Sequence, residues 1–231
     1  RTLALLGGMG YHATAVYYLK INERIQAELG GCSSASLLLY SFNHLEMQTL
    51  FYHGDWVEAS ARLTAAAKNL KAAGAEGFII CCNTAHTVAG QAEAGSGLPL
   101  WHIVDSVGRV IRNAGGVERI ALLGTKMTME GSYFTECLRS GFGLEPMFPE
   151  ERQLQQVHSI VREELSRGIV TQESKDALVQ ILTDLISCGA QGVILGCTEL
   201  QFALKPGDFA VPIWVTMEAH IAEASSWILQ G

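Results

Sequence analysis

The chain has 231 residues, a formal net charge of −7 and 48% hydrophobic residues. This length predicts one or two domains with a core that needs no disulfide staples, and the six cysteines are expected to be free thiols. The acidic balance and the lack of Lys/Arg clusters argue against a nucleic-acid surface, and no apolar run approaches the ~20 residues of a membrane span. No signal peptide is visible, so we expect a cytoplasmic protein without a membrane partner.

The first predicted strand covers residues 2–6 and leads into the turn Gly7-Gly-Met-Gly10, after which a helix begins. The turn fits the spacing of a dinucleotide fingerprint, but the next strand, residues 35–41, ends without an acidic residue for a ribose. A dehydrogenase is therefore disfavoured. The plainer interpretation is an amide-rich turn, with Met9 in it, that holds an anion such as a carboxylate.

Residues 42–54 are predicted to be a loop after the second strand, and such loops commonly carry specificity. Its polar and aromatic residues include His44, Gln48, Tyr52 and His53. Each of them either contacts a ligand or serves solvation and packing. Asp55-x-x-Glu58 then resembles a capping box, and the apolar spacing behind it predicts a helix that ends near Gly74.

The next strand ends at a pair of cysteines, in the sequence Gly77-Phe-Ile-Ile-Cys-Cys-Asn-Thr-Ala-His86. A helix is predicted to begin near Thr84. Residues 98–103 are predicted to form a short strand led by a proline, and residues 105–113 a helix. In a parallel sheet, ligands bind at the edge where the strands end, and Cys82 is expected to lie at that edge.

The second half begins with a strand at Ile120 and a turn at residues 124–128. Two helices, residues 153–166 and 172–187, precede a second cysteine strand, Gly192-Val-Ile-Leu-Gly-Cys-Thr-Glu-Leu200. A strand at residues 211–215 and a final helix follow. Strands that alternate with helices predict a parallel α/β sheet in each half.

Three segments of the first half recur in the second half in the same order and at a nearly constant interval. Leu3-Ala-Leu-Leu-Gly7 matches Ile120-Ala-Leu-Leu-Gly124, and Leu98-Pro-Leu-Trp101 matches Val211-Pro-Ile-Trp214. Between them, Cys82 matches Cys197, and the segments that lead into the two cysteine strands also match. This repetition predicts two similar, pseudo-symmetric parallel-sheet α/β units with the active site in the cleft between them. Residues 1–98 form the first unit and residues 99–214 the second, and the helix of residues 215–231 packs back on the first.

Two matched thiols suit a reaction that removes a proton from one face of a carbon and returns one to the opposite face. A cysteine just before a helix can have its pKa lowered from ~8.5 by the helix dipole and amides. Both Cys82 and Cys197 precede predicted helices, and Asn83, Thr84 and Thr198 supply hydrogen-bond donors beside them.

Other interpretations of these cysteines stay open. The thiols could simply cap the strands as small buried groups. A zinc site from Cys81, Cys82, Cys197 and His86 is disfavoured, because neighbouring residues of a strand point to opposite faces. No metal is therefore expected, and Cys81 is expected to pack behind the sheet. A nucleophile pair of Cys82 with His86 is the remaining possibility.

The motifs Gly7-Gly-Met-Gly10, Cys82-Asn-Thr-Ala-His86 and Leu195-Gly-Cys-Thr-Glu-Leu200 resemble those of the aspartate/glutamate racemase family. The branch that they resemble contains aspartate racemases and broad-specificity amino-acid racemases, and the resemblance spans almost the whole chain. It implies an isomerase that interconverts L- and D-amino acids without pyridoxal phosphate or another cofactor. It also implies that Cys82 and Cys197 are the acid/base pair, with turnover in both directions, and that the protein forms a homodimer.

The resemblance further implies which residues hold the substrate's α-carboxylate and amine. These are Met9, Asn83, Thr84, Thr125, Thr128 and Thr198. Aspartate-specific members carry an arginine where this chain has Tyr52, and a basic residue at the position of Arg167 can bind the side-chain carboxylate. The substrate is therefore an amino acid of the aspartate/glutamate type or a neutral or aromatic one. Further alternatives are a diacid isomerase or decarboxylase of the same fold and a non-catalytic amino-acid-binding protein.

Overall fold

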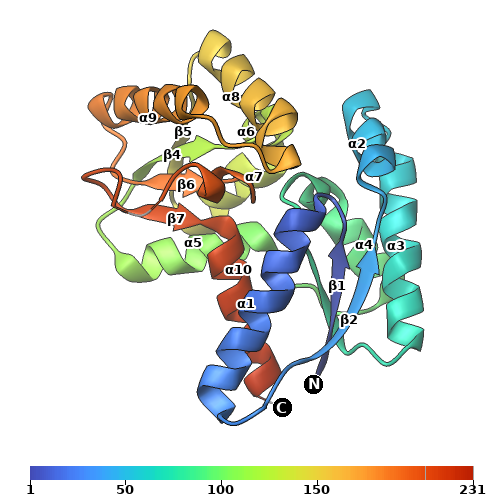
Figure 1. The fold of residues 1–231 in the computed structure, drawn as a ribbon. Coiled ribbons are helices and arrows are strands. Elements are labelled where there is room, and N and C mark those ends of the chain that lie inside the picture. Colours follow the sequence, from blue (N-terminus) through green and yellow to red (C-terminus); the bar gives the residue numbers. More distant parts are fainter. Residues whose placement is uncertain (206, 231) are drawn as a thin grey trace. The chain divides into compact units, whose positions relative to one another are not determined.

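The chain folds into two compact units, each built on one sheet of parallel strands (Figure 1). The structure, a computed structural model, describes residues 1–205 and 207–230; Gly231, the last residue of the predicted C-terminal helix, lies outside this range. Unit 1 comprises Arg1–Ile103 and the C-terminal segment that begins at His220, and unit 2 comprises Val104–Ala219. The predicted divisions after residues 98 and 214 lie a few residues before these points.

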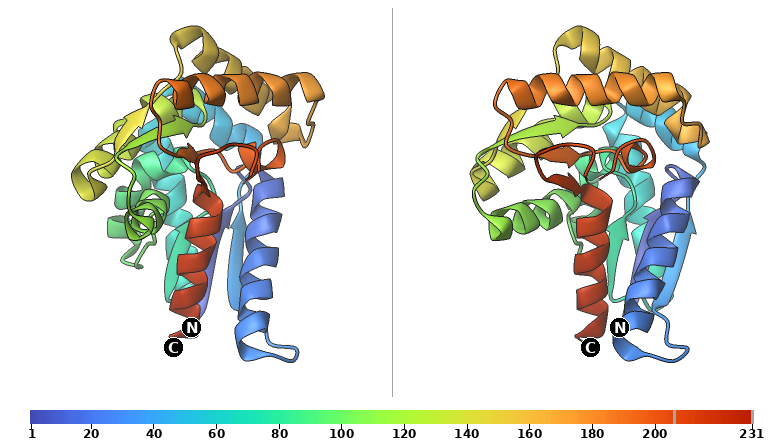
Figure 2. Two further views of the ribbon diagram at one scale, coloured as in Figure 1. Left: turned by 90° about the vertical axis from the view of Figure 1, so that its left-hand side faces the viewer. Right: turned by 60° about the vertical axis from the view of Figure 1, so that its left-hand side comes forward.

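The sheet of unit 1 has the strand order β2-β1-β3, and all its strands run parallel. Because β1 lies between β2 and β3, right-handed connections place α1 and α3 on opposite faces. Figures 1 and 2 show α1 beside the C-terminal part of α10, and a hydrogen bond between Tyr17 and His220 joins these two helices. The elements are β1 Thr2–Gly7, α1 Tyr11–Leu29, β2 Ser36–Ser41, α2 His44–His53, α3 Trp56–Ala72, β3 Gly77–Ile80, η1 Thr84–Val88, α4 Ala89–Ser96 and, from His220 on, α10 Thr216–Leu229.

The sheet of unit 2 has the order β5-β4-β6-β7 and is also parallel. Figure 1 shows α8 and α9 on one side of this sheet and α5 on the other. The elements are α5 Ile103–Ala114, β4 Arg119–Leu123, α6 Lys126–Glu130, α7 Ser132–Glu136, η2 Cys137–Gly141, β5 Glu145–Met147, α8 Glu151–Glu163, η3 Leu165–Arg167, α9 Gln172–Ser187, β6 Val193–Leu195, η4 Leu200–Phe202 and β7 Ile213–Val215.

The loop prediction for residues 42–54 was wrong, because this segment contains helix α2, His44–His53. Met47 and Phe51, four residues apart, lie on one face of the helix and are buried. Gly54 ends the helix in the left-handed conformation, which glycine adopts without strain. Polar residues are interspersed with the apolar ones throughout the segment, so the buried pair did not stand out in the sequence.

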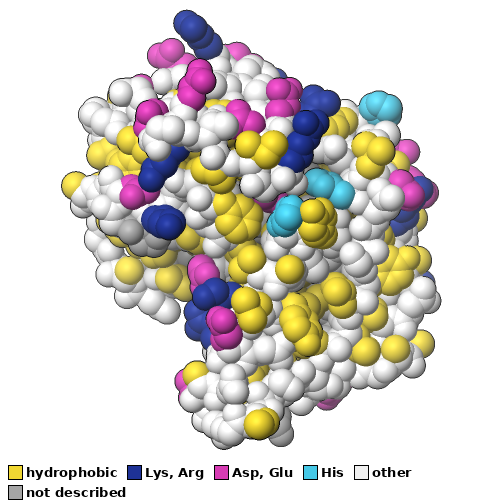
Figure 3. All heavy atoms as spheres, in the orientation of Figure 1, with side chains coloured by type: hydrophobic (Ala, Val, Ile, Leu, Met, Phe, Trp, Pro, Cys, Tyr) yellow, Lys and Arg dark blue, Asp and Glu magenta, His cyan; other side chains and the backbone are white. Residues whose placement is uncertain are grey.

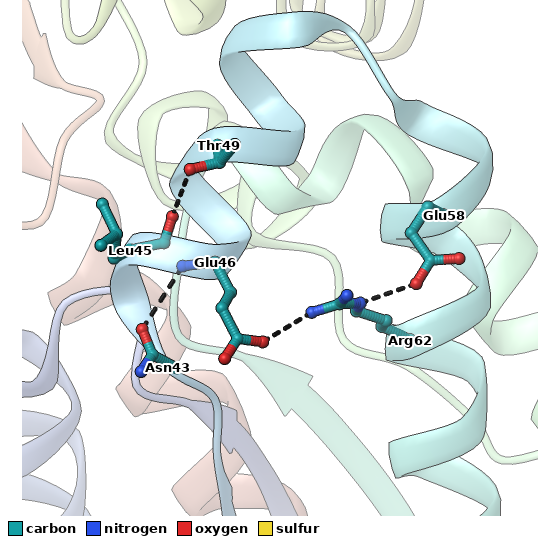
Figure 4. A network of polar contacts seen from close by, with 6 residues as sticks. All are labelled: Asn43, Leu45, Glu46, Thr49, Glu58 and Arg62. Carbon is teal, nitrogen blue, oxygen red and sulfur yellow. Dashed lines mark hydrogen bonds and ion pairs between the residues drawn. The ribbon is translucent and has the colours of Figure 1, made fainter.

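Side chains near the start of α2 connect it to α3 (Figure 4). Asn43 Oδ1 accepts a hydrogen bond from Glu46 N–H at 3.3 Å and so caps α2. Arg62 on α3 donates to Glu46 and to Glu58, both at 2.8 Å. Half of the predicted capping box is formed: Asp55 accepts from Glu58 N–H at 3.1 Å, whereas Asp55 N–H donates to Leu50 O. Exposed ion pairs add little stability, so the buried apolar pair holds α2 in place more than this network does.

The strand predicted at residues 98–103 is also not formed. Only one bridge, between Phe78 and Leu100, joins this segment to β3, and α5 begins at Ile103. Its counterpart in the repeat, β7, pairs with β6 over three residues. Because α10 likewise starts directly after β7, at Thr216, the start of the following helix does not account for this difference.

Each unit packs a tryptophan against the glycine that leads into its cysteine strand. A Cβ atom at Gly77 would collide with the ring of Trp101, and one at Gly192 would collide with the ring of Trp214. An equivalent backbone hydrogen bond follows in both units: Phe78 N–H to Pro99 O at 3.0 Å and Val193 N–H to Pro212 O at 2.9 Å. The sequence repeat is therefore a repeat of packing and not of composition alone.

The surface shows no concentration of one charge on the face drawn in Figure 3. Lys and Arg side chains there are interspersed with Asp and Glu. Within residues 1–205 and 207–230, none of the helices has both the length and the apolar character needed to cross a membrane.

We expect Gly77→Ala to lower the free energy of unfolding by about 1 to 3 kcal/mol, because the new methyl group must displace the Trp101 ring. Gly90→Ala is the matched control: this exposed position in α4 has open space around it, and alanine favours the helix by up to ~1 kcal/mol. Urea unfolding followed by circular dichroism measures both. Equal stability of Gly77→Ala and the wild type would show that the tryptophan does not need this glycine.

Candidate functional site

The ends of β1 and β3 bring the predicted site residues of unit 1 to one edge of its sheet. The two strands are parallel and Leu6 lies opposite Ile80, so the turn with Met9 and the segment that begins at Cys82 leave the sheet together. Met9, Asn83 and Thr84 are buried, whereas Cys82 is partly exposed. The structure thus places three other predicted residues at the same sheet edge as the Cys82 thiol.

The turn after β1 is held by a threonine that the sequence analysis did not single out. Thr14 Oγ1 accepts a hydrogen bond from Gly8 N–H at 2.9 Å and donates one to Gly10 O at 3.1 Å. Gly8 has a φ of 86°, and a Cβ there would collide with the carbonyl oxygen of Phe42. The Gly8 amide, one of the groups predicted to hold an anion, is therefore already used inside the turn.

His86 orients the backbone at Cys82. Its Nδ1 lies 2.8 Å from the carbonyl oxygen of Cys82. Because a carbonyl can only accept, the ring proton is on Nδ1 and Nε2 carries a lone pair. Burial and the neighbouring His102 and His220 lower the pKa of His86 well below its usual value, so the ring is neutral. In this contact His86 is a donor, which fits an orienting role rather than that of a base for the thiol.

A second neutral histidine lies next to it. His220 Nε2 donates to Trp101 O at 2.8 Å, so its Nδ1 accepts from the hydroxyl of Tyr17 at 3.0 Å. Burial lowers the pKa of His220 to about 3. The His86 ring centroid is 4.7 Å from that of His102 and 5.6 Å from that of His220. This cluster was missed in the sequence because His220 lies far along the chain from its partners.

The ends of β4 and β6 group the predicted residues of unit 2 in the same way. Leu123 pairs with Leu195, and the turn with Thr125 and Thr128 leaves the sheet at the same edge as Cys197. Thr125 caps α6, and its Oγ1 lies 3.1 Å from Oγ1 of Thr128. Thr128 is fully buried, in close approach to the backbone after both strands.

A buried carboxylate lies beside Cys197. The thiol donates to Glu199 Oε2 at 3.0 Å, and the hydroxyl of Thr198 donates to the same oxygen at 2.8 Å. All three side chains are buried, at 6%, 7% and 3% exposure in the order Cys197, Glu199, Thr198. Sequence reasoning gave Glu199 no role. The available signal in the sequence was an acidic residue, Glu199, shortly after the apolar strand and its cysteine.

The helix predicted after Cys197 is not formed. The chain makes only the single turn η4, Leu200–Phe202, and the sequence has a proline at position 206 that is unsuited to a helix interior. After Cys82 the chain forms η1 and then α4. One short turn has almost no dipole, so the helix-dipole argument does not apply to Cys197.

The two residues expected to select the side chain are exposed. Tyr52 lies near the end of α2 with 37% of its surface exposed, and Arg167 is the last residue of η3. A further histidine adjoins the Thr125 turn, because His158 on α8 accepts from Lys126 N–H at 3.3 Å. Burial lowers the pKa of His158.

The remaining cysteines form neither disulfides nor, within the described residues, a metal-binding group. All six cysteines are free, and burial raises the pKa of the Cys81 thiol, which is completely enclosed. Cys137 donates to Asp105 at 3.1 Å, and burial followed by this contact raises its pKa to about 12. Within the two described ranges, no three His, Cys, Asp or Glu side chains are grouped to hold a metal ion.

Comparison with known proteins gives consistent matches over nearly the whole chain. Residues 6–224 match the family model described as Asp/Glu/hydantoin racemase. The broad-specificity amino-acid racemase RacX of Bacillus subtilis is 24% identical over 217 residues, which cover 91% of each chain. A solved structure of a candidate Asp/Glu racemase from Yersinia pestis is 39% identical with a TM-score of 0.92 and full coverage of both chains. That of an aspartate racemase homologue from Pyrococcus horikoshii is 31% identical, with a TM-score of 0.82 over 99% of each chain.

Because the buried histidines are neutral in the folded protein, we expect the free energy of unfolding to decrease in acid. Unfolded histidine binds a proton below a pH of about 6.5, whereas folded His220 does so only near 3. Between these values the unfolded state binds more protons, so stability falls as the pH falls, by at most about 1.4 kcal/mol per pH unit for one histidine. Urea unfolding at a series of pH values should show a shallower slope for His220→Gln. Tyr17→Phe, which keeps His220, should retain the wild-type slope, and an unchanged slope in His220→Gln would contradict the assignment.

Proposed function

The chain belongs to the Asp/Glu/hydantoin racemase family and is an isomerase, and on that premise we propose that it interconverts L- and D-amino acids by proton transfer between Cys82 and Cys197. The proposed substrates are of the aspartate/glutamate type, and no pyridoxal phosphate takes part. A neutral or aromatic amino acid is the second candidate.

The observation that carries the proposal is the equivalent backbone position of the two thiols. Cys81 N–H donates to Leu6 O at 2.9 Å in unit 1, and Gly196 N–H donates to Leu123 O in unit 2 at 2.6 Å. Each catalytic candidate is therefore the first residue after the last hydrogen bond to its central strand. A reaction that removes a proton from one face of a carbon and adds one to the other face needs an acid/base group in an equivalent position for each face.

In the proposed reaction one cysteine acts as a thiolate base and the other as a thiol acid. The thiolate takes the α-proton, and the electron pair of the C–H bond moves into the substrate's carboxylate as an enediolate. The second thiol then gives its proton to the opposite face of the carbon. The enediolate needs donors aimed at it, and Asn83, Thr84 and Thr198 are the proposed ones.

The choice of substrate rests on two side chains. Arg167 supports an acidic substrate, because its guanidinium can hold a carboxylate through two hydrogen bonds. Tyr52 supports the second candidate, since it offers no charge where aspartate-specific racemases carry an arginine. The resemblance to RacX, which is named as a broad-specificity enzyme, favours a site that accepts more than one side chain.

We expect Cys82→Ala and Cys197→Ala each to reduce racemisation by about a hundred- to ten-thousand-fold, the usual contribution of one acid/base group. The measurement is proton NMR of a panel of L- and D-amino acids in heavy water without pyridoxal phosphate, combined with optical rotation. Aspartate and glutamate are included in the panel.

Cys32→Ala and Cys188→Ala are matched controls, because these thiols are exposed and there is one in each unit. Both should retain full activity. Racemisation at the wild-type rate in either site variant would refute the two-base mechanism. Wild-type protein that exchanges no α-proton across the panel would favour a diacid isomerase, a decarboxylase or a binding protein of the same fold.

We expect Tyr52→Arg to raise kcat/KM for aspartate by about ten- to a hundred-fold relative to that for a neutral amino acid. One charged hydrogen bond contributes about 1.5 to 3 kcal/mol, which sets this range. Tyr52→Gln, of similar length without the charge, is the control. Steady-state racemisation assays with both substrates measure the ratio, and a ratio that does not change would remove Tyr52 from the site.

A further inference from the structure

A histidine of α8 interrupts the apolar face with which this helix packs within unit 2. Leu154, Val157 and Val161 are buried, and His158 lies on the same face, because residues three and four apart are neighbours on a helix. α6 lies beside α8 (Figure 1), and His158 Nδ1 accepts a hydrogen bond from the amide of Lys126, the first residue of α6, at 3.3 Å. A side chain that is 32 residues away in the sequence therefore holds the start of α6.

The donor in this contact fixes the protonation state of the ring. A backbone N–H can only donate, so Nδ1 of His158 carries a lone pair, and the proton of the neutral ring is on Nε2. A second proton would bind to Nδ1, and the ring would then present a donor to the Lys126 amide. Two donors form no hydrogen bond with each other. The contact therefore exists only while His158 is neutral.

The turn that this bond holds packs against the backbone that presents Cys197. Thr125 caps α6, because its Oγ1 accepts from Thr128 N–H at 3.3 Å. The side chain of Thr128 fills the space beside Gly196, where an added Cβ would lie 3.2 Å from it. Gly196 directly precedes Cys197 in the chain. A continuous series of contacts thus leads from His158 through the turn to the backbone at the thiol.

We propose that His158 is a positioning residue for the substrate: in its neutral form it fixes the turn that contains Thr125 and Thr128, and protonation of the ring releases this turn and weakens substrate binding. The proposal rests on the racemase function proposed above, together with the expectation that these two threonines hold the substrate's α-carboxylate or amine. It makes the binding of substrate at this turn sensitive to acid.

The surroundings of His158 set the pH at which the turn is released. Burial, Arg162 and Lys126 lower the pKa of His158, and Glu130 and Glu163 raise it by less. Other charged side chains on α8 and on the elements that contact it are Glu151, Arg152, Arg167, Glu173, Lys175, Asp176 and Asp184. Because the pKa is lowered, His158 is neutral at neutral pH, and it takes up a proton only below the ordinary histidine value of about 6.5.

The first test does not depend on activity. Proton–nitrogen correlation NMR of the full chain measures the Lys126 amide and both imidazole nitrogens of His158 at a series of pH values. At neutral pH we expect Nδ1 to have the chemical shift of an unprotonated nitrogen and Nε2 that of a protonated one. As the pH falls, the Lys126 amide signal should move with the same midpoint as His158. A proton on Nδ1 at neutral pH, or a Lys126 amide that does not titrate with His158, would overturn the proposal.

Two exposed charges offer matched variants that should move this midpoint in opposite directions. Arg162→Gln removes a positive charge that lowers the pKa of His158, so the midpoint should move to higher pH. Glu130→Gln removes a negative charge that raises the pKa, so the midpoint should move to lower pH. Midpoints that move in the same direction in both variants would show that the titrating group is not His158.

The kinetic test uses the substrate that the heavy-water panel identifies. His158→Asn keeps an acceptor close to the place of Nδ1 but does not titrate, so its KM should equal that of the wild type at neutral pH and should not rise in acid. His158→Leu has no acceptor, and its KM should be about three- to tenfold higher at every pH, the usual effect of one hydrogen bond. The wild type should change from the low KM to the high one through the NMR midpoint, with a smaller change in kcat.

The outcomes separate this inference from the function on which it rests. A KM of His158→Asn that rises in acid as much as that of the wild type would overturn the role of His158 and leave the racemase function standing. Wild-type protein that exchanges no α-proton across the panel would instead refute the function, and the role of His158 in substrate binding with it, even if the NMR titration is as expected.

Discussion

The parallel pairing of a central strand with its cysteine strand is the constraint on which the site depends. In unit 1 the pairing of β1 with β3 stops just before Cys82, and in unit 2 the pairing of β4 with β6 stops just before Cys197. Side chains alternate along a strand, so a shift by one residue would turn each thiol to the opposite face. Burial of the strands on both faces makes such a shift costly, and the tryptophan packed on the leading glycine of each strand opposes it as well.

Around these edges the buried polar side chains make two different kinds of hydrogen bond. In unit 1, His86 and His220 are neutral and donate to backbone carbonyls, so no counter-charge is needed. In unit 2, Glu199 is matched by two donors, one of which is the thiol itself. A buried carboxylate without donors would be costly in free energy, so the thiol and the hydroxyl stabilise Glu199 at this depth. The duplicated framework therefore places different buried polar side chains beside its two equivalent cysteines.

Local predictions failed where tertiary contacts decide the outcome. Polar and apolar residues are mixed along α2, and its helix depends on the burial of Met47 and Phe51. Leu98–Trp101 has almost the same pattern as the segment of β7, yet it makes a single bridge, to Phe78 of β3. The sequence predicts a helix after Cys197, but the chain forms the single turn η4 there. In each case the same local sequence allows more than one structure, and the neighbouring elements select one.

The sequence by itself determined the α/β class, the duplication, the helix at residues 172–187 and the family, because these depend on periodicity and on motifs that are contiguous in the chain. It also singled out Cys82 and Cys197, since the repeat makes them equivalent. Only the tertiary structure decided which hydrogen bonds surround those residues. His220 reaches its partners from the other end of the chain, the Gly8 amide is used by Thr14, and Glu199 turns its carboxylate back onto the thiol. Hydrogen bonds of this kind depend on side-chain direction and burial, which no spacing of residues along a chain specifies.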